Sequence, residues 1–147
     1  MKIRSLTYRT AAAGALGLAL AGSIIAAGSA GASTGANIDQ WRSTWCVNSS
    51  HWFCMYYSPD GQGGSYYSNQ ESIANLSGHY FSNGDPVRND AASIGNGAAN
   101  CPLTTWVYTD FTGDWNWVHG GYGGNLTSSP PLRNNEASIK LTASNCY

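Results

Sequence analysis

Asparagine, aspartate and serine side chains recur in a segment that the chain carries twice. Residues 86–94 return as residues 131–139, and six of the nine positions are identical. Both copies offer side-chain oxygens, which a hard cation such as Ca²⁺ prefers as ligands. The candidate calcium ligands are Asn89, Asp90, Ser93, Asn134, Asn135 and Ser138. The same residue types also close turns by bonding their own backbone, so a calcium site and an ion-free turn both remain open.

No grouping of residues in the sequence predicts catalysis. Residues 31–35 match the G-x-S-x-G pattern. That motif requires a preceding strand, and none is predicted there. The three histidines are scattered, with no second histidine or carboxylate at ligand spacing. Asp110 and Asp114 flank a glycine turn, where aspartate is common. We predict that the protein is not an enzyme and requires no cofactor, with calcium as the one candidate ion.

The four cysteines are spaced as in a small disulfide-bonded protein. They are Cys46, Cys54, Cys101 and Cys146. An even number in a short secreted chain indicates two disulfides, although four cysteines allow three pairings. We favour the closest pair, Cys46–Cys54, which leaves Cys101–Cys146. A zinc site is the alternative, and it lacks the usual C-x-x-C or Cys/His spacing.

The first 32 residues predict a secretory signal peptide. Three basic residues precede an uncharged run rich in alanine and glycine, and an Ala-x-Ala site ends at Ala32. A membrane anchor is the alternative, but the run is short for a span of ~20 residues. Cleavage would leave 115 residues with four basic and eight acidic side chains, a net charge of −4. We therefore predict an extracellular protein that binds neither nucleic acid nor membrane.

The elements that must position these residues are short strands separated by turns. Residues 33–44 are predicted to be a flexible polar tail, and residues 45–147 a single domain of two halves, about 45–95 and 101–147. Aromatic and β-branched runs flank glycine-containing turns at 58–64 and 110–114, which predicts one hairpin in each half. Residues 138–142 alternate as a final strand. No helix is predicted after the signal peptide. Two Greek keys packed face to face would give each half an apolar partner.

The duplicated turns carry a resemblance to a known fold family. Residues 89–93 and 134–138 match the first five positions of [Asn/Asp]-[Asn/Asp]-x-x-[Ser/Thr]-Ser, the calcium-binding signature of βγ-crystallins. Both depart at the sixth position, where Ile94 and Ile139 replace serine. The resemblance implies an all-β, βγ-crystallin-like double Greek-key sandwich, here stapled by two disulfides. The missing hydroxyls weaken the expectation of calcium binding.

A second resemblance concerns function. Cys46, residues 52–56, the following Gly-Gly turn and the Asn-Asp-x-Ala-Ser segment are similar to an actinomycete family of secreted metalloproteinase inhibitors with this fold. That resemblance covers residues 45–142 and implies a monomer whose partner is an extracellular protease, blocked by a tethered, substrate-like loop. The candidate loop residues are Ala99, Asn100, Cys101, Pro102 and Leu103. A plain linker between halves is the alternative for this loop. For the protein, the alternatives are a structural or calcium-binding crystallin-type module, or an antifungal or toxin-like protein on the same scaffold.

Overall fold

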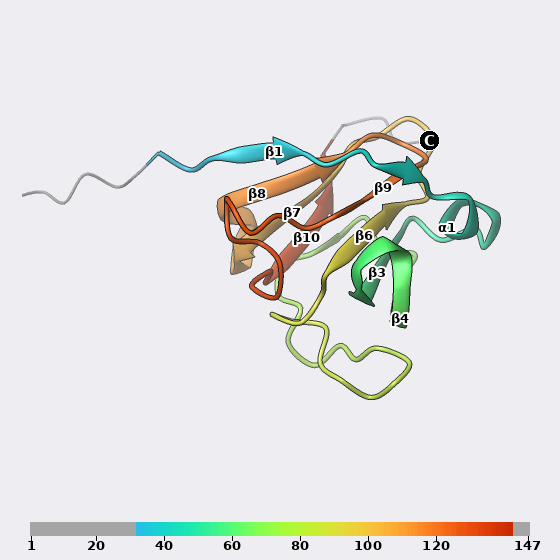
Figure 1. Cartoon of the computed structure of the whole chain (residues 1–147), viewed down its shortest axis with the longest axis horizontal. Helices are drawn as coiled ribbons and strands as arrows, with labels where there is room; N and C mark the ends of the chain where they lie inside the picture. The colour runs from blue at the N-terminus through green and yellow to red at the C-terminus, as the bar shows by residue number, and fades with distance from the viewer. Residues whose placement is uncertain (1–31, 143–147) are drawn as a thin grey trace, which may run out of the picture. The chain divides into compact units, whose positions relative to one another are not determined.

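Two five-stranded sheets make up the part of the chain that the structure, a computed structural model, describes, residues 32–142 (Figure 1). The predicted signal peptide and Cys146 lie outside these described residues. One sheet has the order β1 (Gly35–Asn37), β8 (Thr112–Val118), β7 (Leu103–Tyr108), β10 (Ser138–Leu141) and β5 (Ser72–Ile73). The other has the order β2 (Trp41–Arg42), β9 (Tyr122–Asn125), β6 (Ser93–Asn96), β3 (Phe53–Ser58) and β4 (Gln62–Ser68). The all-β prediction is confirmed.

The two halves of the chain exchange strands between these sheets. Strand β5, from the first half, pairs with β10 of the second half, and β9, from the second half, pairs with β6 of the first. Leu76 donates its N–H to the Ala137 carbonyl, and Leu126 donates its N–H to the Ala92 carbonyl, both at 2.9 Å. Each sheet is therefore completed by the other half, as two interlocked Greek keys require.

Both predicted hairpins are present and end in the same kind of turn. Strands β3 and β4 are joined by the 3₁₀ turn η1 (Pro59–Gly61), and β7 and β8 by η2 (Thr109–Phe111). Asp60 and Asp110 hold the left-handed conformation, with φ of 60° and 58°. Aspartate tolerates that conformation better than most residues do, because its short side chain can bond locally.

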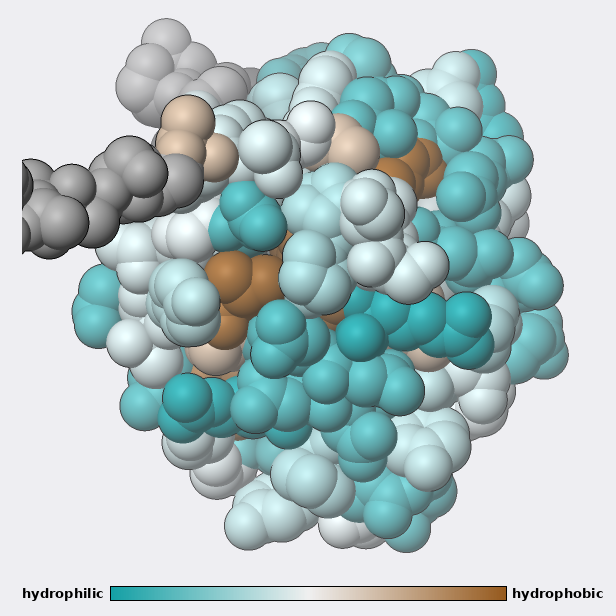
Figure 2. All heavy atoms as spheres, turned by 60° about the vertical axis from the view of Figure 1, so that its left-hand side comes forward, coloured by the Kyte–Doolittle hydropathy of each residue, from teal (hydrophilic) through white to brown (hydrophobic). Residues whose placement is uncertain are grey.

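The core lies between the sheets and is built from strand residues together with residues of the connecting loops, among them Leu76 and Leu132. Its largest fully buried apolar side chains are Phe53, Met55, Leu76, Ile94, Leu103, Leu132 and Ile139. Ile94 and Ile139, which replace serine in the signature, are completely buried there. The face seen in Figure 2 is mainly hydrophilic or neutral, with hydrophobic residues in small separate spots.

The segment 33–44 differs from the predicted tail. It carries β1, which pairs in parallel with β8, and β2, which pairs with β9. Ile38, between them, is 4% exposed and belongs to the core. A side chain at Gly35 would meet the Trp115 ring at 2.0 Å, so glycine is what allows β1 to lie against β8.

A short helix, α1 (Thr44–Asn48), also corrects the expectation of no helix. Cys46 on α1 is disulfide-bonded to Cys54 on β3, which confirms the first predicted pairing. Cys101 is buried and not free. Its pairing with Cys146 stays a prediction. Within residues 32–142, no helix has the length and apolar character needed to cross a membrane.

Candidate functional site

The two copies of the repeated segment face each other. The Asn89 N–H donates to the Glu136 carbonyl at 2.8 Å, and the Asn134 N–H donates to the Ala91 carbonyl at 2.9 Å. Donors and acceptors in these two bonds are equivalent positions of the repeat, so the contact has approximate two-fold symmetry. Asn89 and Asn134 both adopt φ near 60°, where asparagine is tolerated. The repeat therefore forms a paired turn that joins the halves.

Each repeat serine braces the hairpin of its own half. Ser93 Oγ donates to the Ser58 carbonyl at 2.7 Å and accepts from the Gly61 N–H at 3.1 Å. In the second half, Ser138 Oγ donates to the Tyr108 carbonyl at 2.6 Å and accepts from the Phe111 N–H at 3.2 Å. Both serines are fully buried. Their hydroxyls thus satisfy backbone groups at the ends of η1 and η2.

A buried carboxyl group lies between the paired turns. Glu136 Oε1 accepts the N–H of Ala91 at 2.8 Å and that of Asp90 at 3.1 Å. Its Oε2 accepts the Asn135 N–H at 3.1 Å. Burial raises the pKa of Glu136 to about 8, and the backbone N–H donors oppose that shift. The sequence analysis did not predict this role, because Glu136 stands at a position of the repeat where the other copy has Ala91.

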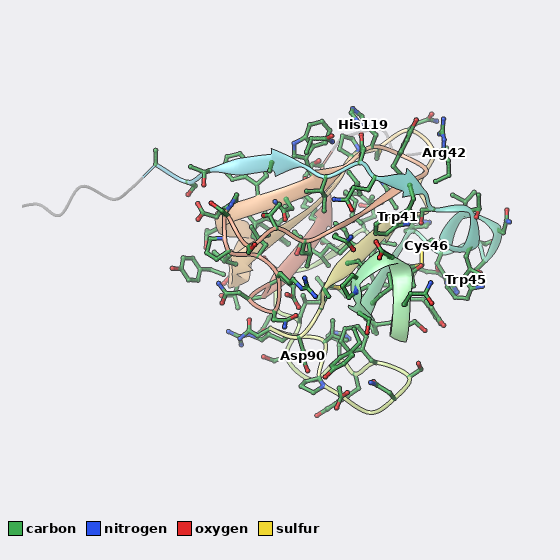
Figure 3. The ribbon with its side chains drawn as sticks, in the orientation of Figure 1. Trp41, Arg42, Trp45, Cys46, Asp90 and His119 are labelled. Atoms are coloured by element: carbon green, nitrogen blue, oxygen red, sulfur yellow. A yellow bond between two sulfur atoms is a disulfide. The ribbon has the colours of Figure 1, made fainter. Side chains whose placement is uncertain are left out.

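The predicted calcium ligands are brought together only in part. Asn89, Asn134 and Asn135 are exposed, and Asp90 is half-buried. In Figure 3, Asp90 lies well away from Trp45 and Cys46. The Ser93 and Ser138 hydroxyls already bond backbone groups. Among residues 32–142, no three His, Cys, Asp or Glu side chains gather as a metal cage. Calcium binding stays a prediction.

The backbone of the predicted inhibitory loop is hydrogen-bonded to a buried side chain. Asn96 is buried, and its Nδ2 donates to the Cys101 carbonyl at 2.6 Å while its Oδ1 accepts the Ala98 N–H at 3.0 Å. Of the five candidate residues, only Ala99 and Asn100 are exposed. Cys101 is buried, and Leu103 is buried as the first residue of β7. The exposed part of the loop is therefore only Ala99 and Asn100, and the hydrogen bonds of Asn96 hold the residues on either side of them.

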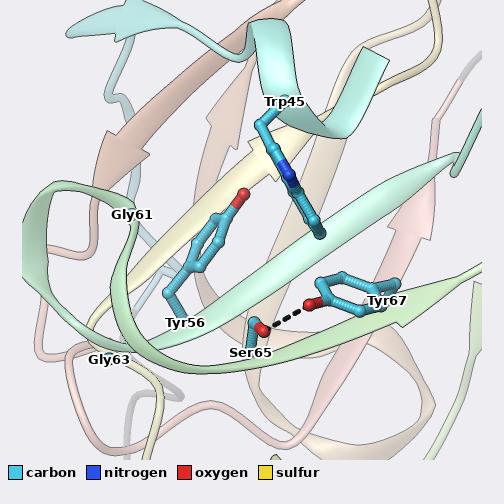
Figure 4. A pocket seen from close by; sticks show the side chains of 6 residues that line it. All are labelled: Trp45, Tyr56, Gly61, Gly63, Ser65 and Tyr67. Atoms are coloured by element: carbon cyan, nitrogen blue, oxygen red, sulfur yellow. Dashed lines mark hydrogen bonds between the residues drawn. The ribbon is translucent and has the colours of Figure 1, made fainter. Parts of the chain in front are cut away.

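An aromatic pocket beside η1 was not predicted (Figure 4). Its lining is Trp45, Tyr56, Gly61, Gly63, Ser65 and Tyr67, around a volume of about 230 Å³. Helix α1 supplies Trp45, and the hairpin supplies the others. In the sequence, Tyr56 and Tyr67 are ordinary strand residues. The folded chain brings Trp45 beside them, with the disulfide tying α1 to β3 and the Ser43 N–H bonded to the Gly121 carbonyl just before the helix.

Comparison with known proteins supports the fold. A structure from work on the evolution of the eye-lens βγ-crystallin domain fold is 12% identical, with a TM-score of 0.50 over 63% of this chain and 86% of that one. A βγ-crystallin from Ciona intestinalis is 16% identical, with a TM-score of 0.48 over 61% and 98% of the two chains. Hahellin, another βγ-crystallin, is 15% identical, with a TM-score of 0.44 over 65% and 99%.

No family model matches the sequence, and no curated protein matches it. The match at a TM-score of 0.50, together with the topology above, establishes a βγ-crystallin-like fold. Because the identity is only 12%, it shows nothing finer than the fold. The comparisons do not extend to the actinomycete inhibitor family.

Proposed function

We propose that the protein is an extracellular, non-enzymatic module of crystallin type whose paired turns are closed by its own side chains. This proposal rests on the hydrogen bonds that Ser93, Ser138 and Glu136 make to backbone groups of the turns. Each serine hydroxyl bonds two backbone groups, and the Glu136 carboxyl accepts three backbone N–H groups between the turns. The Cys46–Cys54 disulfide is in keeping with a place outside the cell.

If this proposal is right, the stability of the folded protein does not depend on calcium. A Ca²⁺ ion needs six to eight oxygen ligands, whereas the buried oxygens at the turns already accept hydrogen bonds. An ion bound only by the folded state would raise the melting temperature by mass action. We expect equal melting temperatures for residues 33–147 in millimolar calcium and in chelator. A higher melting temperature in calcium would contradict the proposal and restore the calcium-binding alternative.

A second candidate function is inhibition of extracellular proteases, favoured by the bracing of the loop tip. Because Asn96 fixes the carbonyl of Cys101 and the N–H of Ala98, the exposed Ala99 and Asn100 lose little entropy on binding a protease cleft. Inhibition of a thermolysin-like metalloprotease, abolished by Asn100→Pro and retained by the exposed-site control Tyr108→Ala, would support this function. Absence of inhibition at micromolar protein would eliminate it for that protease class.

A further inference from the structure

The side chain of Tyr56 is mostly buried, and its hydroxyl reaches into the aromatic pocket. The Tyr56 side chain is 7% exposed, and Figure 4 shows its oxygen directed toward Trp45 rather than toward the strands. Within residues 32–142 it has no hydrogen-bond partner. Burial raises the pKa of Tyr56 to about 12, and the nearby Tyr67 adds to the shift, so the group stays a neutral donor. A hydroxyl that opens into a pocket and bonds no protein group there can donate to and accept from a ligand.

Trp45 forms one wall of the pocket as a flat platform that is half exposed. The indole is 50% exposed, although tryptophan is among the largest apolar side chains. Its position is fixed on two sides. The next residue, Cys46, is tied to β3 by the disulfide, and the Tyr67 ring lies 4.7 Å away, centre to centre. An exposed aromatic face held in place needs little further ordering when a ligand binds.

Tyr67 and Ser65 supply the polar side of the pocket. Their hydroxyl oxygens are 2.5 Å apart and form a hydrogen bond, drawn in Figure 4. The outer face of Tyr67 stacks on His51 with ring centres 5.0 Å apart and an angle of 9°, and His51 Nδ1 is 3.1 Å from Asn69 Oδ1. Each hydroxyl can both donate and accept. The opposite wall is the backbone of Gly61 and Gly63, which adds no side chain.

These groups define the ligand by its chemistry. No charged side chain lines the pocket, so a charged ligand would find no counter-ion there. A pyranose ring has an apolar C–H face and a rim of hydroxyls, which match an exposed indole beside three phenol or alcohol groups. The volume of about 230 Å³ is below the ~300–1,000 Å³ of drug-sized sites and suits one ring. We propose that the aromatic pocket binds one sugar unit of a neutral glycan, packed on Trp45 and hydrogen-bonded to Tyr56, Ser65 and Tyr67.

The proposal goes beyond the crystallin-type module and is tested by titration. Residues 33–147 are titrated calorimetrically with laminarihexaose, cellohexaose, chitohexaose and mannohexaose, and separately with choline as a cationic probe. We expect at least one oligosaccharide to bind. Tyr56→Phe, which removes one hydroxyl, should raise its Kd about three- to tenfold. Trp45→Ala should raise it by about tenfold or more. Tyr108→Ala, an exposed aromatic in the other hairpin, should leave it unchanged.

Three results would overturn the proposal. The first is no binding of any of the four oligosaccharides at millimolar concentration. The second is saccharide binding that neither Trp45→Ala nor Tyr56→Phe weakens while both variants keep the parental melting temperature. The third is choline binding that Trp45→Ala abolishes, in the absence of saccharide binding, which would make the pocket a cation cage. Calcium independence is measured separately, so failure here leaves the proposed function standing.

Discussion

The two hairpins share one backbone design and differ in the side chains beside the turn. Gly61 and Phe111 end η1 and η2 with φ of 68° and 60°. In the second hairpin, the Phe111 ring packs edge-on against Trp106 at 5.4 Å, and Lys140 Nζ lies 5.4 Å from its centre. In the first, glycine leaves the space next to Tyr56 open.

The strand pairs repeat the same contrast. Tyr56 pairs with Ser65 in the first hairpin, where Trp106 pairs with Trp115 in the second. Small residues therefore stand where bulky rings fill the second half. Both halves share the serine-braced turn, and the first half leaves an open pocket beside it. The paired turns differ in a similar way, because Glu136 stands where the first copy has Ala91.

Removing the carboxyl that distinguishes the second turn should have the largest effect. Glu136→Ala makes this position alike in the two turns but leaves the buried N–H of Ala91 without its acceptor. The N–H groups of Asp90 and Asn135 lose one of two acceptors, because they also donate to the Val87 and Leu132 carbonyls. One unpaired buried donor costs about 1–3 kcal/mol, and the fully buried side chain leaves a cavity, so we expect a loss of roughly 2–4 kcal/mol in the free energy of unfolding by urea titration. Arg133→Ala, at an exposed position of the same turn, is the control. A loss equal to that of the control would show that the turns do not depend on this group.

The same carboxyl predicts an unusual pH dependence. Its pKa is raised from 4.5 to about 8 in the folded protein, so the folded state keeps a proton that the unfolded state releases between these values. The contribution of Glu136 to stability should be greatest below pH 4.5 and fall as the pH rises toward 8, by at most about 1.4 kcal/mol per pH unit.

Glu136→Gln provides the matched control for that pH dependence. The amide cannot ionise, although its NH₂ group faces the Asn135 N–H and lowers the baseline stability. Subtracting its pH profile from that of the parent isolates the contribution of Glu136. A difference that stays flat from pH 4.5 to 8 would mean that the N–H donors hold the carboxyl ionised throughout.

Replacing either repeat serine should lower the stability of the protein by a similar amount, although the side chains next to the two turns differ. Ser93→Ala and Ser138→Ala each remove one hydroxyl that bonds a carbonyl and an N–H at the end of a 3₁₀ turn. Each should lower the free energy of unfolding by about 1–3 kcal/mol. Measuring both by urea titration tests the symmetry, and a large difference between them would show that only one turn relies on its serine.

Local patterns in the sequence predicted much of this fold, and contacts between distant residues account for what was missed. The hairpins and the Cys46–Cys54 disulfide depend on nearby residues, and the repeat was visible as repetition. Strand β1 exists only through pairing with β8, about 80 residues away, which no local pattern encodes. Contacts between distant residues also explain what was missed in the paired turns and the aromatic pocket. The acceptor role of Glu136 and the place of Trp45 both depend on partners that the folded chain brings together.

The smallest change in stability is expected from exchanging the residue at the end of the 3₁₀ turn, where the two hairpins have glycine and phenylalanine. Gly61→Phe copies Phe111 into the first turn, where φ is already compatible with phenylalanine in the second. A Cβ atom at Gly61 would lie 3.8 Å from the Tyr56 ring, an ordinary contact, so the new ring can enter the pocket. We expect a stability cost of about 1–2 kcal/mol for the left-handed residue, less what the buried ring returns. Saccharide binding should be lost while urea titration shows a folded protein. Binding retained in a folded Gly61→Phe variant would place the ligand elsewhere and leave the open first hairpin without a function.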